Sequence, residues 1–354
     1  MTGSRRPWQG TWPHREPSRI YPPHIDLPFW TGQHPEASLA QQRAARWALG
    51  HGLVRDGAVG QFEQLGYGRL LSSLCPQAGL DDLVLVVLWN VLFFVADDQQ
   101  AHAAVTGRLE RYEDVVAQMR HLVEGRPQPR GTAQPLVAAL SDLLGRTSAR
   151  GQGTWEERFR GNLDRWLAGH LRENAYRRAG RVPSIEEYVT VRRDACTVFP
   201  TLDLVELCEQ VEVPADVYRS GPYQTLISGT ADIMCWINDI HSLERELAEG
   251  DPINLAIVLQ QLRGMTAQEA VDHVAALVSV RVAEHLAAAA ALPALMADMG
   301  VSRETQDKVM RCVRNQGSWA AAMTAWDRSG TIRHRDSMAA PGAAAYHTDL
   351  LTTD

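Results

Sequence analysis

The stretch LVLVVLWNVLFFVADDQQ, residues 83–100, is the part of the sequence that says most about the architecture. Residues 83–96 are apolar except for Asn90, and two aspartates, Asp97 and Asp98, follow directly. An apolar run of this length is too short to span a bilayer. Because the run has no polar face, we interpret it as a helix buried on all sides within a large protein. The aspartates then border the core, which is costly unless something compensates their charge.

The remainder of the chain carries helix signals one after another, with almost no alternation typical of strands. Two capping-box patterns, at residues 184–187 and 266–269, open segments with apolar residues at helical spacing. Three more helices are predicted after Thr154, over about 224–249 and over about 302–326. These signals predict an all-α protein.

Short segments rich in Gly and Pro separate the predicted helices, but no repeat or long linker divides the chain. We therefore predict one all-helical domain over residues 36–335. Residues 1–35 are rich in Pro and aromatic side chains, so we expect an irregular arm that packs across the body and could serve as a lid. Residues 336–354 are small and polar, and we expect a disordered tail.

Composition sets limits on the function. Of the 354 residues 45% are hydrophobic and 22% charged, as in a globular protein, and the net charge is −7 with no basic block, which argues against nucleic-acid binding. Residues 1–30 lack an apolar leader segment, so we expect no membrane insertion. The five cysteines form no CxxC pair, which favours reduced thiols and a cytoplasmic location. The sequence leaves the oligomeric state open, a homodimer included.

Two groups of oxygen-bearing side chains indicate a metal site. Carboxylates such as Asp97 and Asp98 suit Mg²⁺, although a solvated helix end would explain the pair equally well. Asn238, Ser242 and Glu246 follow at intervals of four residues, so on an α-helix their amide, hydroxyl and carboxylate oxygens share one face. This second group emerges from an apolar segment too, and the two together favour a function.

The chain resembles bacterial class I terpene synthases in two motifs, the Asp-Asp pair at residue 97 and N-D-x-x-S-x-x-x-E from Asn238. The resemblance covers roughly residues 50–335. The resemblance implies a helical bundle around a central active-site cavity, three Mg²⁺ ions and a prenyl diphosphate substrate. It makes Asp97 the stronger ligand and Asp98 a supporting one. The chain departs from the family at the third acidic position, which is Ala101, and this departure predicts weaker closure of the site.

Three arginines are candidates for binding the diphosphate. The family carries a diphosphate-sensing arginine about 46 residues before the motif asparagine, where this chain has Arg192. Arg245 adjoins Glu246 and can reach a phosphate oxygen with its fork of donors. The family ends with an Arg-Tyr pair after a tryptophan, and here Arg333 and a histidine follow Trp326.

The resemblance also implies how a carbocation would be held and which reaction follows. Phe93, Phe94 and Trp326 are candidates for aromatic walls, and of the two phenylalanines we expect one to face the cavity and one the core. Farnesyl diphosphate is the favoured substrate, with geranylgeranyl diphosphate second. A chain-elongating prenyl transferase and a non-catalytic protein that binds isoprenoid diphosphates are the alternatives.

Overall fold

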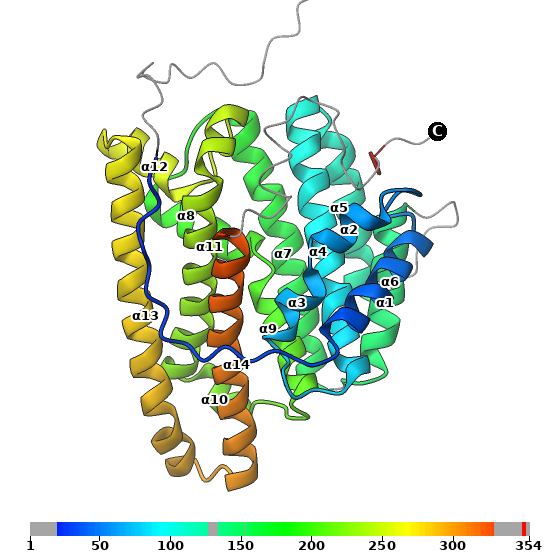
Figure 1. Ribbon diagram of the computed structural model, residues 1–354, viewed down its shortest axis with the longest axis vertical. Coiled ribbons are helices and arrows are strands. Elements are labelled where there is room, and N and C mark those ends of the chain that lie inside the picture. Colours follow the sequence, from blue (N-terminus) through cyan, green and yellow to red (C-terminus); the bar gives the residue numbers. More distant parts are fainter. Residues whose placement is uncertain (1–19, 127–133, 152, 329–348, 352–354) are drawn as a thin grey trace, which may run out of the picture.

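The computed structural model describes residues 20–126, 134–151, 153–328 and 349–351, and these form helices without any strand (Figure 1). The prediction of an all-α fold is confirmed. The helices are α1 (Ala37–Gly50), α2 (Val59–Gln64), α3 (Tyr67–Ser72), α4 (Leu80–Thr106), α5 (Leu109–Val123), α6 (Pro135–Ser148), α7 (Thr154–Ala179), α8 (Ile185–Ala195), α9 (Val198–Cys208), α10 (Ala215–Arg219), α11 (Gly221–Glu249), α12 (Leu255–Arg263), α13 (Ala267–Asp298) and α14 (Arg303–Arg328).

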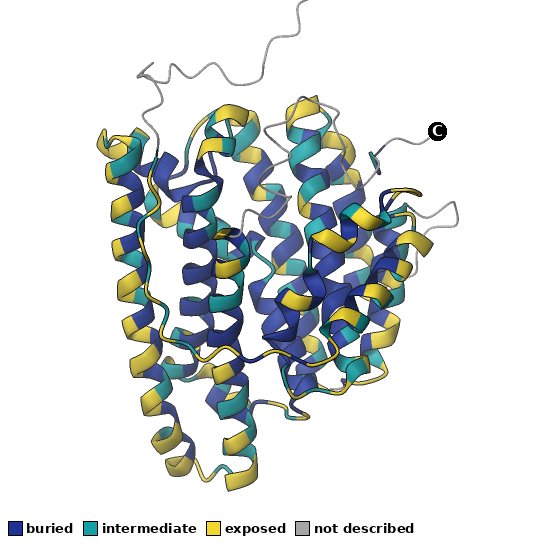
Figure 2. Cartoon of the chain, in the orientation of Figure 1, coloured by how far each residue is buried: buried dark blue, intermediate teal, exposed yellow. Residues whose placement is uncertain are grey.

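Helix α4 is the centre of one half of the bundle. It contacts α1, α3, α5, α6, α7 and α9, and nearly every residue from Leu83 to Ala96 is buried (Figure 2). The buried helix predicted from the apolar run is therefore present. It does not end at the aspartates, however, because α4 continues to Thr106. Asp97 and Asp98 lie within a helix whose C-terminal half emerges from the core.

The predicted helix starts agree with the structure. Ser184 and Thr266 both form complete capping boxes, in which the side chain accepts from the amide three residues on and the glutamate there accepts from the cap amide. Helix α7 begins at Thr154, and the helices predicted over 224–249 and 302–326 correspond to α11 and α14. All five cysteines are free thiols, and four of them are buried.

Helix α13 lies on the outside of the bundle beside α11 (Figure 1). Within the described ranges it is the one helix long and apolar enough to cross a membrane, and a third of its most apolar stretch is buried. The sequence shows no long unbroken run of large apolar residues here, because the apolarity of α13 comes largely from alanines. Length and composition alone are weak support for a membrane span, and α13 also packs on α12 and α14.

Residues 20–34 have no regular secondary structure and cross the outer surface of α13 and α14 (Figure 1). The amide and carbonyl of Tyr21 both bond to the side chain of Gln268 on α13. The Phe29 ring packs edge-on against His285, and the amide of Gly32 donates to Ser318 Oγ on α14. The described part of the arm therefore ties two outer helices together.

The expectation of a disordered tail does not hold for residues 349–351. Leu350 and Leu351 are buried, and the amide of Leu350 donates to the side chain of Gln99 on α4. The remainder of the predicted tail lies outside the described residues. Small, polar composition suggested fraying, but two leucines at the end of the chain supply the apolar surface that fixes this short segment.

Helices α7 and α8 approach each other closely at Gly169. A Cβ at this position would lie 2.4 Å from the backbone nitrogen of Ala195, the last residue of α8. Cys196 then adopts an extended conformation that separates α8 from α9. Glycine at 169 is therefore required for the contact that supports this break in the helix.

We predict that Gly169→Ala destabilises the protein by about 1–3 kcal/mol, because the methyl group meets backbone that cannot move aside. Gly161→Ala is the matched control on the same helix, since a Cβ there has nothing within 4 Å. It should stabilise α7 by about 0.5–1 kcal/mol. Urea unfolding followed by circular dichroism measures both changes. A Gly169→Ala protein as stable as the wild type would contradict the prediction.

Candidate active site

The Asn238 motif occupies the C-terminal half of α11. Ser242 and Glu246 are buried, and Asn238 is half-buried. Ser242 Oγ donates to the backbone carbonyl of Asn238 at 2.8 Å, so the hydroxyl oxygen retains a lone pair for another partner. The three side chains come from successive turns of one helix, as the spacing predicts.

Asp239, beside the motif asparagine, is a buried anchor with no exposed surface. Its carboxylate accepts from the hydroxyl of Tyr188, from Arg192 and from the amide of Leu255 at 2.7 Å. Burial raises the pKa of Asp239, although Arg192 and the hydrogen bonds oppose that rise. This one carboxylate joins α8, α11 and the start of α12.

Arg192 and Arg193 point to different sides of α8. Arg192 Nη2 donates to Asn238 Oδ1 at 3.0 Å and also pairs with Asp239. Arg193 instead forms two bonds of 2.6 Å to Asp232, which precedes the motif on α11. The structure thus brings Arg192 to the motif and leaves its neighbour outside it.

Glu246 lies between two donors. Arg245 Nη2 contacts Glu246 Oε1 at 3.0 Å, and Asn254 Nδ2 donates to Glu246 Oε2 at 2.9 Å. Burial raises the pKa of Glu246 to about 7, against the opposing charge of Arg245. The Nε–H of Arg245 is itself buried and has no hydrogen-bond partner among the described residues. A buried donor without a partner is costly, so a ligand atom that accepts a hydrogen bond from this nitrogen would remove that cost.

On α4, Asp97 is exposed and Asp98 half-buried. Burial raises the pKa of Glu173 on α7 and of Glu249 at the end of α11, and the negative charge of Asp97 adds to both shifts. The Asp97 carboxylate therefore acts on residues of both neighbouring helices. The C-terminal ends of α4, α7 and α11 lie at the same, upper end of the bundle in Figure 1.

A chain of polar contacts through α7 connects α4 to the segment that follows α11. Gln100 Nε2 donates to Glu173 Oε2 at 3.2 Å, Arg177 Nη1 donates to the same oxygen, and Arg177 Nη2 donates to Asp251 at 2.7 Å. Sequence reasoning missed Glu173, Arg177 and Asp251. The i, i+4 spacing of Glu173 and Arg177 on a predicted helix was a usable signal, whereas Asp251 stands in a Gly-Asp-Pro segment that indicated only a turn.

The three candidate aromatic residues separate into two groups. Phe93 is 2% exposed and packs against Trp89 and Trp166, so it belongs to the core. Phe94 is half-buried and stacks on Tyr67 at 4.7 Å between ring centroids, with Trp326 at 5.8 Å. Of the two phenylalanines, Phe93 therefore faces the core, and Phe94 remains the candidate for a cavity wall; Tyr67, on which Phe94 stacks, is itself fully buried.

Arg333, the remaining candidate, lies outside the described residues.

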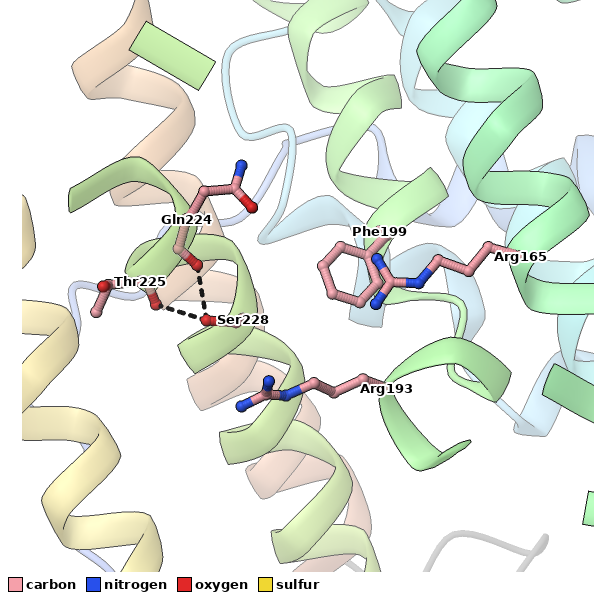
Figure 3. A pocket seen from close by; sticks show the side chains of 6 residues that line it. All are labelled: Arg165, Arg193, Phe199, Gln224, Thr225 and Ser228. Carbon is pink, nitrogen blue, oxygen red and sulfur yellow. Dashed lines mark hydrogen bonds between the residues drawn. The ribbon is translucent and has the colours of Figure 1, made fainter. Parts of the chain in front are cut away.

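A surface pocket of about 290 Å³ involves none of the predicted residues (Figure 3). Its two arginines already pair with carboxylates: Arg193 with Asp232 and Arg165 with Asp194. We therefore do not assign the chemistry to this pocket, which is lined by Arg165, Arg193, Phe199, Gln224, Thr225 and Ser228.

The donor set fits magnesium held jointly with a phosphate. Within the described residues no three carboxylate, imidazole or thiol groups form a ready-made metal cage. The oxygen donors are instead divided between α4, with Asp97 and Asp98, and α11, with Asn238, Ser242 and Glu246. Mg²⁺ is commonly bound in this way, by one or two carboxylates plus oxygens of the substrate. The unpartnered Arg245 donor beside Glu246 agrees with an anionic ligand there.

Comparison with known proteins agrees with this geometry. The model of terpene synthase family 2, C-terminal metal binding, matches residues 88–284. The chain is 33% identical to pristinol synthase of Streptomyces pristinaespiralis, over 86% of this chain and 85% of the relative. It is 28% identical to a (+)-T-muurolol synthase of Roseiflexus castenholzii, which cyclises (2E,6E)-farnesyl diphosphate, over 71% and 77% of the two chains. The crystal structure of an α-eudesmol synthase superposes with a TM-score of 0.76 at 26% identity, covering 86% of this chain and 99% of the other.

The family model spans both the Asp97 pair and the Asn238 motif, and the pristinol synthase match extends over most of both chains. The fold and the placement of the metal-ligand candidates are thus accounted for by one family. The chain belongs to terpene synthase family 2 and is a class I terpene cyclase, a metal-binding carbon–oxygen lyase that acts on phosphates.

Proposed function

We propose that this enzyme ionises farnesyl diphosphate with the help of Mg²⁺, cyclises the carbocation to a sesquiterpene and releases diphosphate. The observation that carries the proposal is the unpartnered, buried Nε–H of Arg245, which lies beside Glu246 on the helix that presents Asn238 and Ser242. The substrate length rests on the relatives, since the T-muurolol synthase acts on farnesyl diphosphate.

Positive groups at the upper end of the bundle would stabilise the leaving diphosphate. Arg192 is held in place by Asp239, and Arg245 by Glu246 and Glu249, so neither guanidinium has to reorganise fully when the C–O bond breaks. Asp97 and Asp98, together with Asn238, Ser242 and Glu246, are the residues that would hold three Mg²⁺ ions, which when bound withdraw charge from the diphosphate. Arg333 remains a predicted further donor.

Phe94 and Trp326, which are half-buried and pack against the buried ring of Tyr67, would stabilise the hydrocarbon cation. Phe94 lies one turn before Asp98 on α4, so its ring is near the place where the leaving group departs. A desolvated aromatic face stabilises a cation by about 2 kcal/mol. None of the three rings offers a strong nucleophile, and the Trp326 Nε1–H is already occupied by the carbonyl of Leu65 at 2.7 Å.

We expect incubation with farnesyl diphosphate and Mg²⁺ to give a cyclic C15 product, identified in the extract by gas chromatography and mass spectrometry. Parallel reactions contain geranylgeranyl diphosphate, or farnesyl diphosphate plus isopentenyl diphosphate. A cyclic C20 product alone would transfer the proposal to the longer substrate. Longer diphosphates would indicate a prenyl transferase, and the absence of any product would favour a protein that only binds its ligand.

Glu246→Gln should lower kcat by about 100-fold or more, because the amide retains the shape of the side chain but loses the charge needed to hold Mg²⁺. Glu244→Gln is the control, since Glu244 is exposed on the same helix two residues earlier. It should remain within about twofold of wild type. Initial rates across a Mg²⁺ titration measure both, and near-normal turnover by Glu246→Gln at low Mg²⁺ would refute the assignment.

Neighbouring arginines provide a second matched pair. Arg192→Gln should reduce kcat by about 100-fold or more, as expected when a preorganised donor to a developing anion is removed. Arg193→Gln breaks only the contact with Asp232, so turnover should stay within a few-fold while the melting temperature falls. Steady-state kinetics and thermal unfolding of both variants distinguish the two roles. Equal losses of kcat would contradict the orientation described for α8.

A further inference from the structure

We propose that the end of the chain, residues 349–351, positions the aspartate motif for metal binding, with Asp349 and Leu350 as positioning residues. This inference rests on the proposed function, because it concerns how α4 presents Asp97 and Asp98. Nothing in the resemblance places these residues near the motif, and their composition predicted a disordered tail. In Figure 1 they form the small red segment near the upper end of α4 and α5.

The first contact is a backbone hydrogen bond to the residue directly after Asp98. The amide of Leu350 donates to Gln99 Oε1 at 2.9 Å, and Gln99 has no exposed surface. A bond of this kind is directional, so it limits how far α4 can rotate about its axis at Gln99. Rotation there would turn the two preceding carboxylates away from their present orientation.

The second contact is an ion pair at the end of the same helix. The carboxylate of Asp349 pairs with Arg108, in the turn between α4 and α5, and His102 on α4 lies 3.8 Å from the same carboxylate. Arg108 Nη2 also contacts His102 Nε2 at 2.8 Å. The side chain of Asp349 therefore contacts both the C-terminal half of α4, at His102, and the turn that follows α4, at Arg108.

Burial holds the segment in place. Leu350 and Leu351 are 5% and 2% exposed, and both belong to the apolar core, although they stand next to the end of the chain. The amide of Leu351 donates to Asp349 Oδ1 at 3.0 Å, which fixes the carboxylate relative to the leucines. The apolar and ionic contacts thus act as one unit.

The next residue of α4 is held by another helix. Gln100 Nε2 donates to the carbonyl of His170, to Glu173 and to Asn174, all on α7. The two residues after Asp98 are therefore held by separate elements, Gln99 by the end of the chain and Gln100 by α7. Position 101 of α4 is an alanine and carries no charge. Asp349 instead brings a carboxylate to this end of the helix.

Asp349→Asn in the full-length protein tests the proposal, since it keeps the shape of the side chain and weakens the pair with Arg108. We expect the apparent Mg²⁺ constant to rise about tenfold, as when a residue that orients a metal ligand is changed. At saturating Mg²⁺, kcat should remain within about twofold and the product unchanged. Asp216→Asn is the control, because Asp216 forms an exposed ion pair with Arg219 on α10 and should shift neither constant.

Calorimetric titration with inorganic diphosphate in the presence of Mg²⁺ gives a readout that does not depend on turnover. Asp349→Asn should bind this probe about tenfold more weakly than the wild type, and Leu350→Pro, which removes the amide donor, should do the same. A lower melting temperature with unchanged Mg²⁺ and diphosphate constants would overturn the proposal, because a merely structural role predicts that result.

The two proposals fail in different ways. If the wild type binds Mg²⁺ and diphosphate but forms no product, the proposed function is overturned, and the binding constants of the variants still decide whether residues 349–351 position the aspartate motif. If the wild type forms product and the variants bind Mg²⁺ and diphosphate as tightly as the wild type, only the proposed role of residues 349–351 is overturned. A wild type that neither forms product nor binds the probe would overturn both.

Discussion

Asp239 carries a negative charge in a place that water does not reach, and the site is arranged around that constraint. Moving a carboxylate into the protein interior costs several kcal/mol unless donors surround it. Tyr188, Arg192 and the Leu255 amide meet that requirement from α8 and the start of α12. A consequence is that Arg192 is held against Asn238, so the residue expected to sense the substrate is oriented by a charge that never contacts the substrate.

A second buried charge on α7 is likewise surrounded by groups of opposite charge. Arg177 is placed between Glu173 and Asp251, and burial of the guanidinium is outweighed by these two carboxylates, so its pKa is raised. Because Gln100 shares Glu173 with Arg177, the position of α4 is coupled to the segment that follows α11. Polar contacts through α7 therefore help to hold the two groups of oxygen donors in fixed relation.

Much of this arrangement could be predicted from the sequence, for physical reasons that differ between residues. An apolar run over residues 83–96 is longer than a usual strand and too short for a membrane span, which favours a buried helix. A four-residue spacing places Asn238, Ser242 and Glu246 on one helix face. The orientation of Phe93 and Phe94 could not be assigned, since adjacent residues on a buried helix both look apolar. The roles of Glu173, Arg177 and Asp251 depend on tertiary contacts between segments more than seventy residues apart, which no local pattern records. The leucines at the end of the chain were misjudged because two apolar residues make too weak a compositional signal.

The aromatic group has a consequence for how enzymes of this kind diversify. Tyr67 belongs to α3, Phe94 to α4 and Trp326 to α14, so the aromatic group is drawn from three helices, two of which carry none of the predicted metal ligands. If this group borders the bound hydrocarbon as proposed, substitutions at Tyr67 or Trp326 would alter the contour that folds the flexible chain, while the predicted metal ligands keep their positions. Evolution could then change ring skeletons by mutation on α3 and α14 without altering the helices that carry out ionisation.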